Sequence, residues 1–357
     1  MDKISAVICE LNPLHEGHKY ILSKAKEHGD TVIAIMSGNF VQRGEAAVYD
    51  KYRRAESALE AGADLVVELP FPWSAASAEF FAAAGVEIAE KLGAENLVFG
   101  SECGEIDVLN KASEITKKAE FLEIPANIRA AKYREDLLYK YDNSLPNGLL
   151  SSANDILGIE YIKNLKAAVP IPCKRISCHR ASSIRADMKD NHELYADAVF
   201  SDKLFDLAFY KYRLNSDSKE YITAESKGGV GERLAKSAFV SKNGVEMLEK
   251  AKTKQYTDAR LRRAALFFLT EVYMNDLKEL PLYTILLGAN DKGREYLSNI
   301  RKEDKISIIT KPSDESNLSD EAKRQYRIEK RADSLYTLLM NETESGDYFI
   351  KKSPIIK

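Results

Sequence analysis

Two histidines near the N-terminus have a spacing that suits phosphate chemistry. His15 and His18 flank Gly17 and are two of only five histidines in the chain. Imidazole rings donate hydrogen bonds to phosphate oxygens, and a glycine between them lets the backbone approach a ligand closely. A zinc site is disfavoured, because its usual histidine pair shares one helical face with a third ligand, and no Cys or His cluster accompanies this pair. Two surface histidines in a loop remain the alternative.

The segments around these histidines predict a turn between a strand and a helix. Residues 4–11 form an apolar, β-branched run typical of a strand buried on both faces of a parallel sheet. Pro13 and Gly17 then interrupt the chain, and from Lys19 the apolar residues have helical spacing until Gly29. Unpaired backbone N–H groups and the helix dipole favour an anion at such a turn.

Further strands and helices alternate over the first hundred residues. Residues 31–36, 65–69 and 96–99 read as strands, and residues 52–61 and 75–92 read as helices. This alternation predicts a parallel sheet with helices on both faces, in which ligands bind beyond the carboxyl ends of the strands. Unusual loops follow all four strands, namely the HxGH turn and the segments 37–45, 68–74 and 99–105. We therefore group these loops into one site.

The second half of the chain has a different pattern. Residues 105–168 are mainly helical with a break at 143–154, residues 170–177 read as the last strand of the sheet, and 179–185 as a loop entering a helix. Helical patterns dominate from about residue 195 to 275, residues 311–324 read as a solvated linker, and 320–340 as a last helix. The predicted fold is α/β: a Rossmann-like, doubly wound parallel sheet over residues 1–195, then a mainly helical domain over 196–357.

Composition limits the class of protein. The chain has 357 residues, 45% of them hydrophobic, which is typical of a soluble globular protein with two domains. It contains neither an apolar run of 18 residues nor a charged-then-apolar leader, so we expect a cytoplasmic protein without a membrane span. Four irregularly spaced cysteines favour buried thiols over disulfides or a metal knuckle. A net charge of −3 means that any contact with RNA requires a local basic patch.

One segment has the charge for such a patch. Residues 250–263 contain six basic residues and one acidic residue. Just beyond, Leu261, Ala265, Phe268 and Val272 form a helical stripe that can pack while the arginines face outward. A solvated charged face is the alternative. Tyr256 either stacks on a base or belongs to the core.

The motif around His15 and His18 resembles the HxGH signature of the nucleotidylyltransferase superfamily, whose members attack the α-phosphate of ATP and expel pyrophosphate. Five further segments, in the same order, resemble the tRNA(Met) cytidine acetate ligase family. They are Ser37–Ala46, Asp64–Pro70, Phe99–Glu102, Asn154–Gly158 and Ser182–Arg185, and the resemblance resumes at residues 252–263. The tetrad departs from the family pattern at Leu14, Glu16 and Ile21, where Phe, Asn and His are common.

This resemblance implies an ATP site. His15 and His18 would be catalytic, and we expect His18, nearest the helix start, to contact the α-phosphate. Ser182 and Ser183 would donate to the β- and γ-phosphates unless they merely cap a helix, and Arg185 would supply guanidinium donors. The alternative interpretation of Gly100 is a turn glycine, and that of Asn154 is a helix cap. Arg175 lies in a predicted strand, where a charged side chain needs a partner. The expected ATP-binding residues are Val7, Ile8, Cys9, Glu10, Leu11, Asn12, Pro13, Leu14, His15, Glu16, Gly17, His18, Lys19, Tyr20, Gly100, Asn154, Arg175, Ser182, Ser183 and Arg185.

The resemblance also implies partners and a reaction. The substrates would be ATP, accompanied by Mg²⁺ but without a protein metal site, acetate, and elongator tRNA(Met), whose wobble cytidine would be acetylated on N4 through acetyl-adenylate. The tRNA backbone would contact Lys252, Lys254, Arg260, Arg262 and Arg263. Arg43 and Glu45 are either ligand contacts or a salt-bridged pair. Two alternatives stay open: a nucleotidylyltransferase that adenylates a small phosphorylated metabolite, and an RNA-binding protein with a degenerate nucleotide fold.

Overall fold

The N-terminal part of the chain alternates strands and helices as the sequence predicts. The computed structural model describes residues 3–119, 130–178, 181–215, 222–300, 306–342 and 344–357. Its first four main strands are fully or almost fully buried, which explains their continuous apolar runs. The elements are β1 (Ile4–Cys9), α1 (Glu16–His28), β2 (Thr31–Ser37), α2 (Lys51–Glu60), β5 (Leu65–Leu69), α3 (Ala78–Lys91) and β6 (Asn96–Ser101). A short 3-10 turn (Trp73–Ala75) precedes α3.

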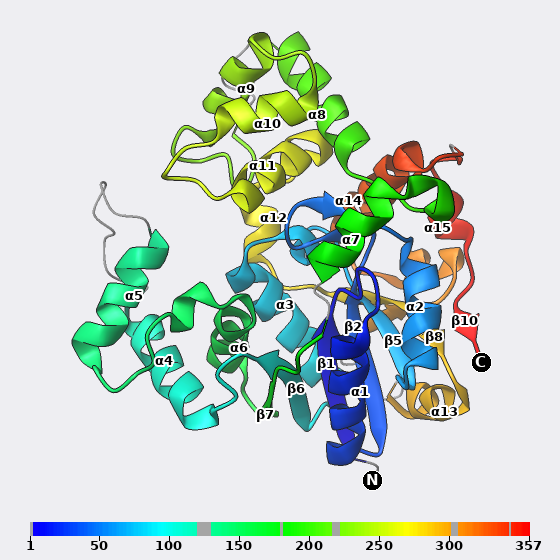
Figure 1. Cartoon of the computed structure of the whole chain (residues 1–357). Coiled ribbons are helices and arrows are strands. Elements are labelled where there is room, and N and C mark those ends of the chain that lie inside the picture. Colours follow the sequence, from blue (N-terminus) through cyan, green and yellow to red (C-terminus); the bar gives the residue numbers. More distant parts are fainter. Residues whose placement is uncertain (1–2, 120–129, 179–180, 216–221, 301–305, 343) are drawn as a thin grey trace.

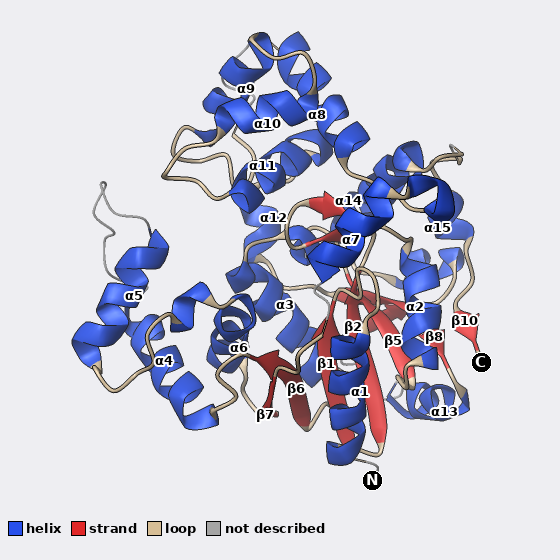
Figure 2. Cartoon of the chain, in the orientation of Figure 1, coloured by secondary structure: helices blue, strands red, loops and turns tan. Residues whose placement is uncertain are grey.

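These strands belong to one mostly parallel sheet (Figures 1 and 2). Its order is β10-β8-β5-β2-β1-β6-β7, with β9 beside β8, and β5 and β8 are antiparallel. The added strands are β7 (Val169–Lys174), β8 (Tyr283–Ala289), β9 (Ser307–Ile309) and β10 (Ile355–Ile356). The prediction of an α/β fold with a mainly parallel sheet is confirmed. The prediction that residues 170–177 form the last strand is wrong, because three later strands join the sheet.

Two groups of helices extend from the sheet (Figure 1). The first follows β6 and comprises α4 (Ile106–Ala119), α5 (Ala130–Tyr141) and α6 (Ala153–Asn164), and the break at 143–154 packs against α5 and α6 through a 3-10 turn, Leu149–Ser151. The second lies above the carboxyl edge of the sheet. It comprises α8 (Asp202–Leu214), α9 (Val230–Phe239), α10 (Gly244–Ala251), α11 (Asp258–Thr270) and α12 (Met274–Lys278), with α7 (Ala181–Asp190) between it and the sheet.

The chain then returns to the sheet. After β8 come α13 (Asp291–Ile300), a 3-10 segment (Pro312–Asn317), α14 (Asp320–Leu339) and α15 (Tyr348–Lys351). The helix predicted at 320–340 is confirmed as α14, but it is not the last helix, because α15 follows it. The mainly helical character expected from residue 196 onward holds as far as Lys278, whereas the remaining residues complete the N-terminal sheet. The boundary at residue 195 stays a prediction.

A buried cluster of charges ties α14 to the sheet. The ammonium of Lys51 lies 2.8 Å from Glu68 Oε2, 2.7 Å from Asp333 Oδ2 and 3.5 Å from Glu329 Oε1. All four side chains are at most 5% exposed. Burial and the neighbouring Glu68 raise the pKa of Glu329 well above its usual range. The three carboxylates are close enough to hold a cation, and that cation is Lys51.

A second buried cation on α2 fixes the carboxyl ends of the two central strands. The guanidinium of Arg54 donates to the carbonyl oxygens of Glu10 at 2.7 Å, Ser37 at 3.0 Å and Gly38. It also donates to the carbonyl oxygen of Tyr49 at 2.9 Å. Backbone carbonyls at strand ends lack sheet partners, and a planar five-donor group can satisfy several of them at once. Arg54 therefore sets the shape of the edge at which the predicted site lies.

The Lys51 cluster predicts a large effect of a neutral substitution. Lys51→Met should destabilise the protein by about 3–5 kcal/mol, because it leaves three buried carboxyl groups without their cation. Urea unfolding at neutral pH measures this change. Lys24→Met removes an exposed ion pair with Glu27 and should have a much smaller effect on stability, because solvent screens such pairs. Equal effects of the two substitutions would contradict the proposed importance of the cluster.

Candidate active site

The HxGH turn is built by hydrogen bonds between its own residues. His15 is the N-cap of α1, and its Nδ1 accepts a hydrogen bond from the backbone N–H of Gly17 at 3.0 Å. His18 Nδ1 accepts one from the N–H of His15 at 3.3 Å. The rings stack, with centroids 3.8 Å apart. Because each Nδ1 acts as an acceptor, the proton of each neutral ring lies on Nε2, which can donate to a ligand.

Electrostatics keep both histidines neutral. Burial and, as a smaller cause, the adjacent His15 lower the pKa of His18 to about 3. The pKa of His15 is also lowered, first by burial and then by the positive charge of Arg175. Two neutral Nε2–H donors therefore stand at the N-terminus of α1 at physiological pH, where the helix dipole favours an anion.

Gly17 is required by close packing at this turn. A Cβ atom at position 17 would lie 2.9 Å from His15 Cε1 and 3.2 Å from Cys178 Sγ. The residue after β7 that carries this sulfur thus packs directly against the turn. Any side chain at position 17 would displace the ring whose orientation the turn fixes.

Arg185 of α7 reaches the same turn from far along the chain. Its Nη1 donates to the carbonyl oxygen of Asn12 at 2.8 Å. Asn12 is buried, and its Oδ1 accepts from the backbone N–H of Val48 at 2.8 Å. The structure therefore brings His15, His18 and Arg185 to one strand-end turn, as expected from the sequence, although 167 positions separate His18 from Arg185.

A second group lies on the side of the turn toward β6 and β7. Glu102 Oε1 accepts from Asn154 Nδ2 at 3.0 Å and pairs with Arg175 Nη1 at 3.4 Å. Arg175 follows the end of β7 and has the acidic partner that its position required. Gly100 in β6 has open space around its Cα, since a Cβ there would meet only Ile21 Cδ1, at 3.7 Å. Glu102 is the last residue of the Phe99–Glu102 motif, but nothing in the sequence indicates that it contacts both Asn154 and Arg175.

Other predicted nucleotide-binding residues include buried side chains of β1 and the exposed side chain of Glu16. The side chains of Val7, Ile8 and Cys9 are buried in the sheet, so they shape the site from below. Burial raises the pKa of Cys9 to about 12, which makes it an inert thiol. Glu16 is exposed and pairs with Lys19 at 2.8 Å, so its carboxylate is neutralised at the surface.

Ser182 and Ser183 lie in the first turn of α7, which begins at Ala181. Both are exposed. Because the helix begins before them, neither occupies the cap position that the alternative interpretation required. His179 and Arg180, in the same predicted loop, lie outside the described residues.

The basic segment is less free than its composition indicates. Arg262 pairs with Glu45, and Arg263 Nε pairs with Glu225 Oε1 at 2.8 Å. Arg260 pairs with the same glutamate at 3.5 Å and stacks on the ring of Tyr256, whose hydroxyl donates to the carbonyl of Gly228. The expectation that these arginines face outward is wrong, because they are half-buried at contacts within the chain. Lys252 and Lys254 are exposed.

Glu45 belongs to a hairpin that joins the HxGH turn to the helical region. The hairpin is formed by β3 (Phe40–Val41) and β4 (Glu45–Ala46). Gln42 N–H donates to Glu10 Oε1 at 2.8 Å, and a Cβ at Gly44 would lie 2.5 Å from the backbone nitrogen of Arg263. Arg43 and Glu45 are therefore not a pair, since Glu45 pairs with α11.

Comparison with known proteins identifies the family. The HIGH Nucleotidyl Transferase model matches residues 2–193 and 177–348. The tRNA(Met) cytidine acetate ligase of Clostridium perfringens is 34% identical, with 99% of both chains covered, and that of Pediococcus pentosaceus is 33% identical over 99% of this chain and 98% of the relative. The crystal structure of Thermotoga maritima TmcAL bound with alpha-thio ATP superposes with a TM-score of 0.91 at 29% identity, covering 99% of both chains. This chain belongs to the tRNA(Met) cytidine acetate ligase family.

The HxGH turn and Arg185 carry N–H donors of the kind that phosphate oxygens accept from. None of the described helices is long and apolar enough to span a membrane.

The lowered pKa of His18 predicts a pH dependence of stability. The unfolded chain binds a proton at His18 near pH 6.5 and the folded chain only near pH 3, so protonation between these values favours unfolding. The wild type should lose stability as pH falls through this window, by at most about 1.4 kcal/mol per pH unit from this residue. His18→Asn keeps an acceptor for the His15 N–H and should remove this contribution. Urea unfolding of both proteins at several pH values between 4 and 7.5 measures it, and parallel stability curves would contradict it.

Proposed function

We propose that this protein is an ATP-dependent ligase that activates acetate as acetyl-adenylate and acetylates N4 of the wobble cytidine of elongator tRNA(Met). The names of its relatives support the acceptor, and the alpha-thio ATP in the Thermotoga maritima structure supports the nucleotide. One observation in the chain carries the proposal: two neutral imidazoles and the guanidinium of Arg185 meet at one turn between β1 and α1.

In the first step an acetate oxygen attacks the α-phosphorus of ATP. The new P–O bond forms as the bond to the β-phosphate breaks, and pyrophosphate leaves with the electron pair. Negative charge grows on the leaving group and spreads over the equatorial oxygens, so fixed donors lower the barrier. His18 Nε2–H is assigned to the α-phosphate and His15 Nε2–H to a neighbouring phosphate. The expected donors to the remaining oxygens are Arg185 and the hydroxyl groups of Ser182 and Ser183.

In the second step the cytidine amino nitrogen attacks the acetyl carbonyl carbon. The C–N bond forms, the C–O bond to phosphate breaks, AMP leaves with the electron pair, and the amino group releases one proton to solvent. Adenylation is necessary because a free carboxylate resists attack by an amine, whereas AMP is a good leaving group. The enzyme would work in the cytoplasm.

Mg²⁺ would travel with the nucleotide. Among the described residues, the group of clustered carboxylates surrounds Lys51 and not the HxGH turn. A Mg²⁺ ion that accompanies ATP is typically bound by phosphate oxygens and water, and no step above requires a protein ligand to it.

The tRNA backbone is assigned to the exposed part of the basic segment. Lys254 and Lys252 are both exposed, although Lys252 also contacts Glu249 at 2.7 Å and Asp258 at 3.1 Å. Arg260 and Arg263 are anchored to Glu225, so they hold the segment in place and contribute positive potential. Such a patch serves RNA binding despite the negative net charge of the chain.

The reaction itself tests the proposal. Purified protein, ATP, labelled acetate and elongator tRNA(Met) should yield labelled N4-acetylcytidine on nucleoside mass spectrometry, with pyrophosphate and AMP as products. Omission of ATP should abolish the label. Pyrophosphate release that depends on a phosphorylated metabolite instead of acetate would replace this function with a simple adenylyl transfer.

Loss of one phosphate donor should slow adenylation. We expect His18→Asn to reduce acetate-dependent ATP–pyrophosphate exchange by about 10²–10³-fold, the usual cost of removing a donor to developing negative charge. His28→Asn is the matched control, because His28 is the last residue of the same helix and uses only its backbone carbonyl, as acceptor from Asn96. Equal exchange rates in His18→Asn and wild type would remove His18 from the catalytic site.

A further inference from the structure

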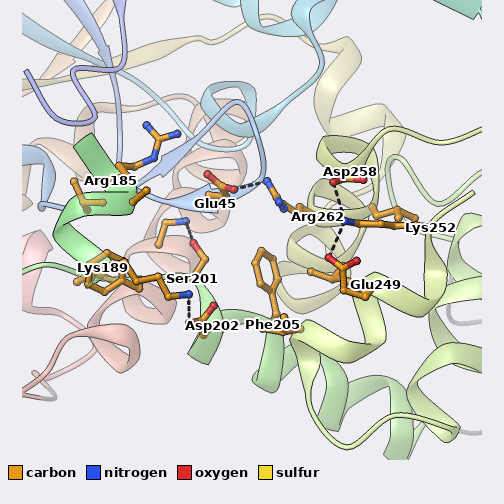
Figure 3. A pocket seen from close by; sticks show the side chains of 18 residues that line it. Glu45, Arg185, Lys189, Ser201, Asp202, Phe205, Glu249, Lys252, Asp258 and Arg262 are labelled. Atoms are coloured by element: carbon orange, nitrogen blue, oxygen red, sulfur yellow. Dashed lines mark hydrogen bonds and ion pairs between the residues drawn. The ribbon is translucent and has the colours of Figure 1, made fainter. Parts of the chain in front are cut away.

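A cavity of about 280 Å³ lies between the HxGH turn and the second group of helices (Figure 3). Its walls come from β4, from α7 and the segment that follows it, and from α8, α10 and α11. For residues in its lining, the family resemblance implies a phosphate contact of Arg185 and tRNA-backbone contacts of Lys252 and Arg262, but no contact with a base. Glu45 and Arg262 form one polar pair of the lining, beside the pairs of Lys189 with Asp202 and of Lys252 with Glu249 and Asp258. Val48, Phe205 and Val245 are among its apolar residues.

The cavity shares two residues with the turn that would hold the triphosphate. Arg185 lines it and donates to the carbonyl oxygen of Asn12, and Val48 lines it and donates to Asn12 Oδ1. A ligand in the cavity would therefore lie next to the predicted phosphate site. Acetate and the cytidine must both be held close to that site, so the cavity is placed for one of them.

The cavity and the group formed by Gly100, Asn154 and Arg175 lie on opposite sides of β1. Gly100, Asn154 and Arg175 lie around the ends of β6 and β7, on one side of β1. The β3–β4 hairpin follows β2, which pairs with the other side of β1. The HxGH turn thus stands between two regions, and the one beside β2 is available for the acceptor.

The polar pair in the cavity has a specific hydrogen-bonding pattern. Glu45 presents a carboxylate, which only accepts, and Arg262 presents a guanidinium, which only donates. The base-pairing edge of cytosine has one donor, the amino N–H at N4, next to two acceptors, N3 and O2. Carboxylate acceptance from the cytosine amino group is a standard contact in nucleic-acid recognition. Uracil offers O4 and N3–H in the corresponding positions and would place its carbonyl against the carboxylate.

The apolar walls suit a flat ring. Val48 and Phe205 are buried at 2% and 5% exposure, and Figure 3 shows the ring of Phe205 between Ser201 and the polar residues of α10 and α11. Enzymes that modify a base hold it outside the stack, in a pocket with hydrogen bonds to its pairing edge and apolar contacts to its faces.

We propose that this cavity receives the target cytosine of the RNA substrate, with Glu45 accepting from the N4 amino group and Arg262 donating to N3 and O2. The inference rests on the proposed function, because it takes a cytosine amino group as the acetyl acceptor. It gives Arg262 a base-recognition role in place of the backbone contact expected from the sequence. It also gives a reason for the pairing of Arg262 on α11 with Glu45 of the β3–β4 hairpin. The two side chains meet only where α11 packs against the hairpin.

Separate measurement of the two half-reactions tests this inference. Acetate-dependent ATP–pyrophosphate exchange reports adenylation, and acetyl transfer to elongator tRNA(Met) reports use of the acceptor. Glu45→Gln should lower kcat/KM for transfer at least 30-fold and leave exchange within about three-fold of wild type. Val245→Trp fills the cavity from α10 without changing a charge, and should have the same effect. Glu232→Gln, an exposed glutamate on α9 outside the cavity, is the control and should change neither rate.

The outcomes separate this inference from the proposed function. Wild-type protein that fails to catalyse exchange would reject the function itself. Wild-type exchange together with near-normal transfer in Glu45→Gln and Val245→Trp would overturn the cytosine pocket alone. A parallel loss of exchange and transfer in both variants would also overturn it, because it would place ATP or acetate, the substrates of the exchange reaction, in the cavity. Because Val245 is 42% exposed, its substitution is expected to preserve folding, which thermal unfolding of each variant will verify.

Discussion

Two buried cations on α2 determine the shape of the functional edge. Arg54 donates hydrogen bonds to the carbonyl oxygens at the ends of β1 and β2, and Lys51 pairs with carboxylates from β5 and α14. Buried charges are costly unless they are paired and hydrogen-bonded, so each cation enforces a narrow arrangement of the groups around it. The HxGH turn begins directly after Glu10, one of the residues that Arg54 fixes. The chemistry at His15 and His18 therefore depends on a helix that contacts no phosphate in our assignment.

The same cations connect distant parts of the chain. Asp333 accepts from Lys51 and also from Asn39 Nδ2 at 2.8 Å, and Asn39 Oδ1 accepts from the backbone of Lys51. Tyr336, one turn further along α14, donates to the carbonyl of Ala47 at 2.8 Å. The segment between β2 and α2, which carries the β3–β4 hairpin, is thus clamped between α2 and α14. Its position decides where Glu45 meets Arg262.

Local patterns predicted the parallel core and the turn, because both depend on residues close in sequence. The apolar runs of β1, β2, β5 and β6 predict buried strands by themselves, and the glycine between two histidines predicts the turn. Strand β8 was not predicted. It follows a long helical stretch and pairs antiparallel to β5, so it is not part of an alternating βαβ pattern. Lys51 and Arg54 look like ordinary charged residues of a surface helix until the fold buries them. The pairing of Arg262 with Glu45 spans 217 positions, and no local rule identifies it.

The Lys51 cluster also orders events during biosynthesis. Domains fold as the chain emerges, beginning at the N-terminus, and the first 100 residues supply both histidines. Glu329 and Asp333 lie on α14, whose end at Leu339 is close to the C-terminus. A nascent polypeptide that lacks them leaves the Lys51–Glu68 pair without its partners on α14 and the Asn39 loop unclamped. Residues as far as Asp333 must therefore be synthesised before the segment beside the HxGH turn takes its final form.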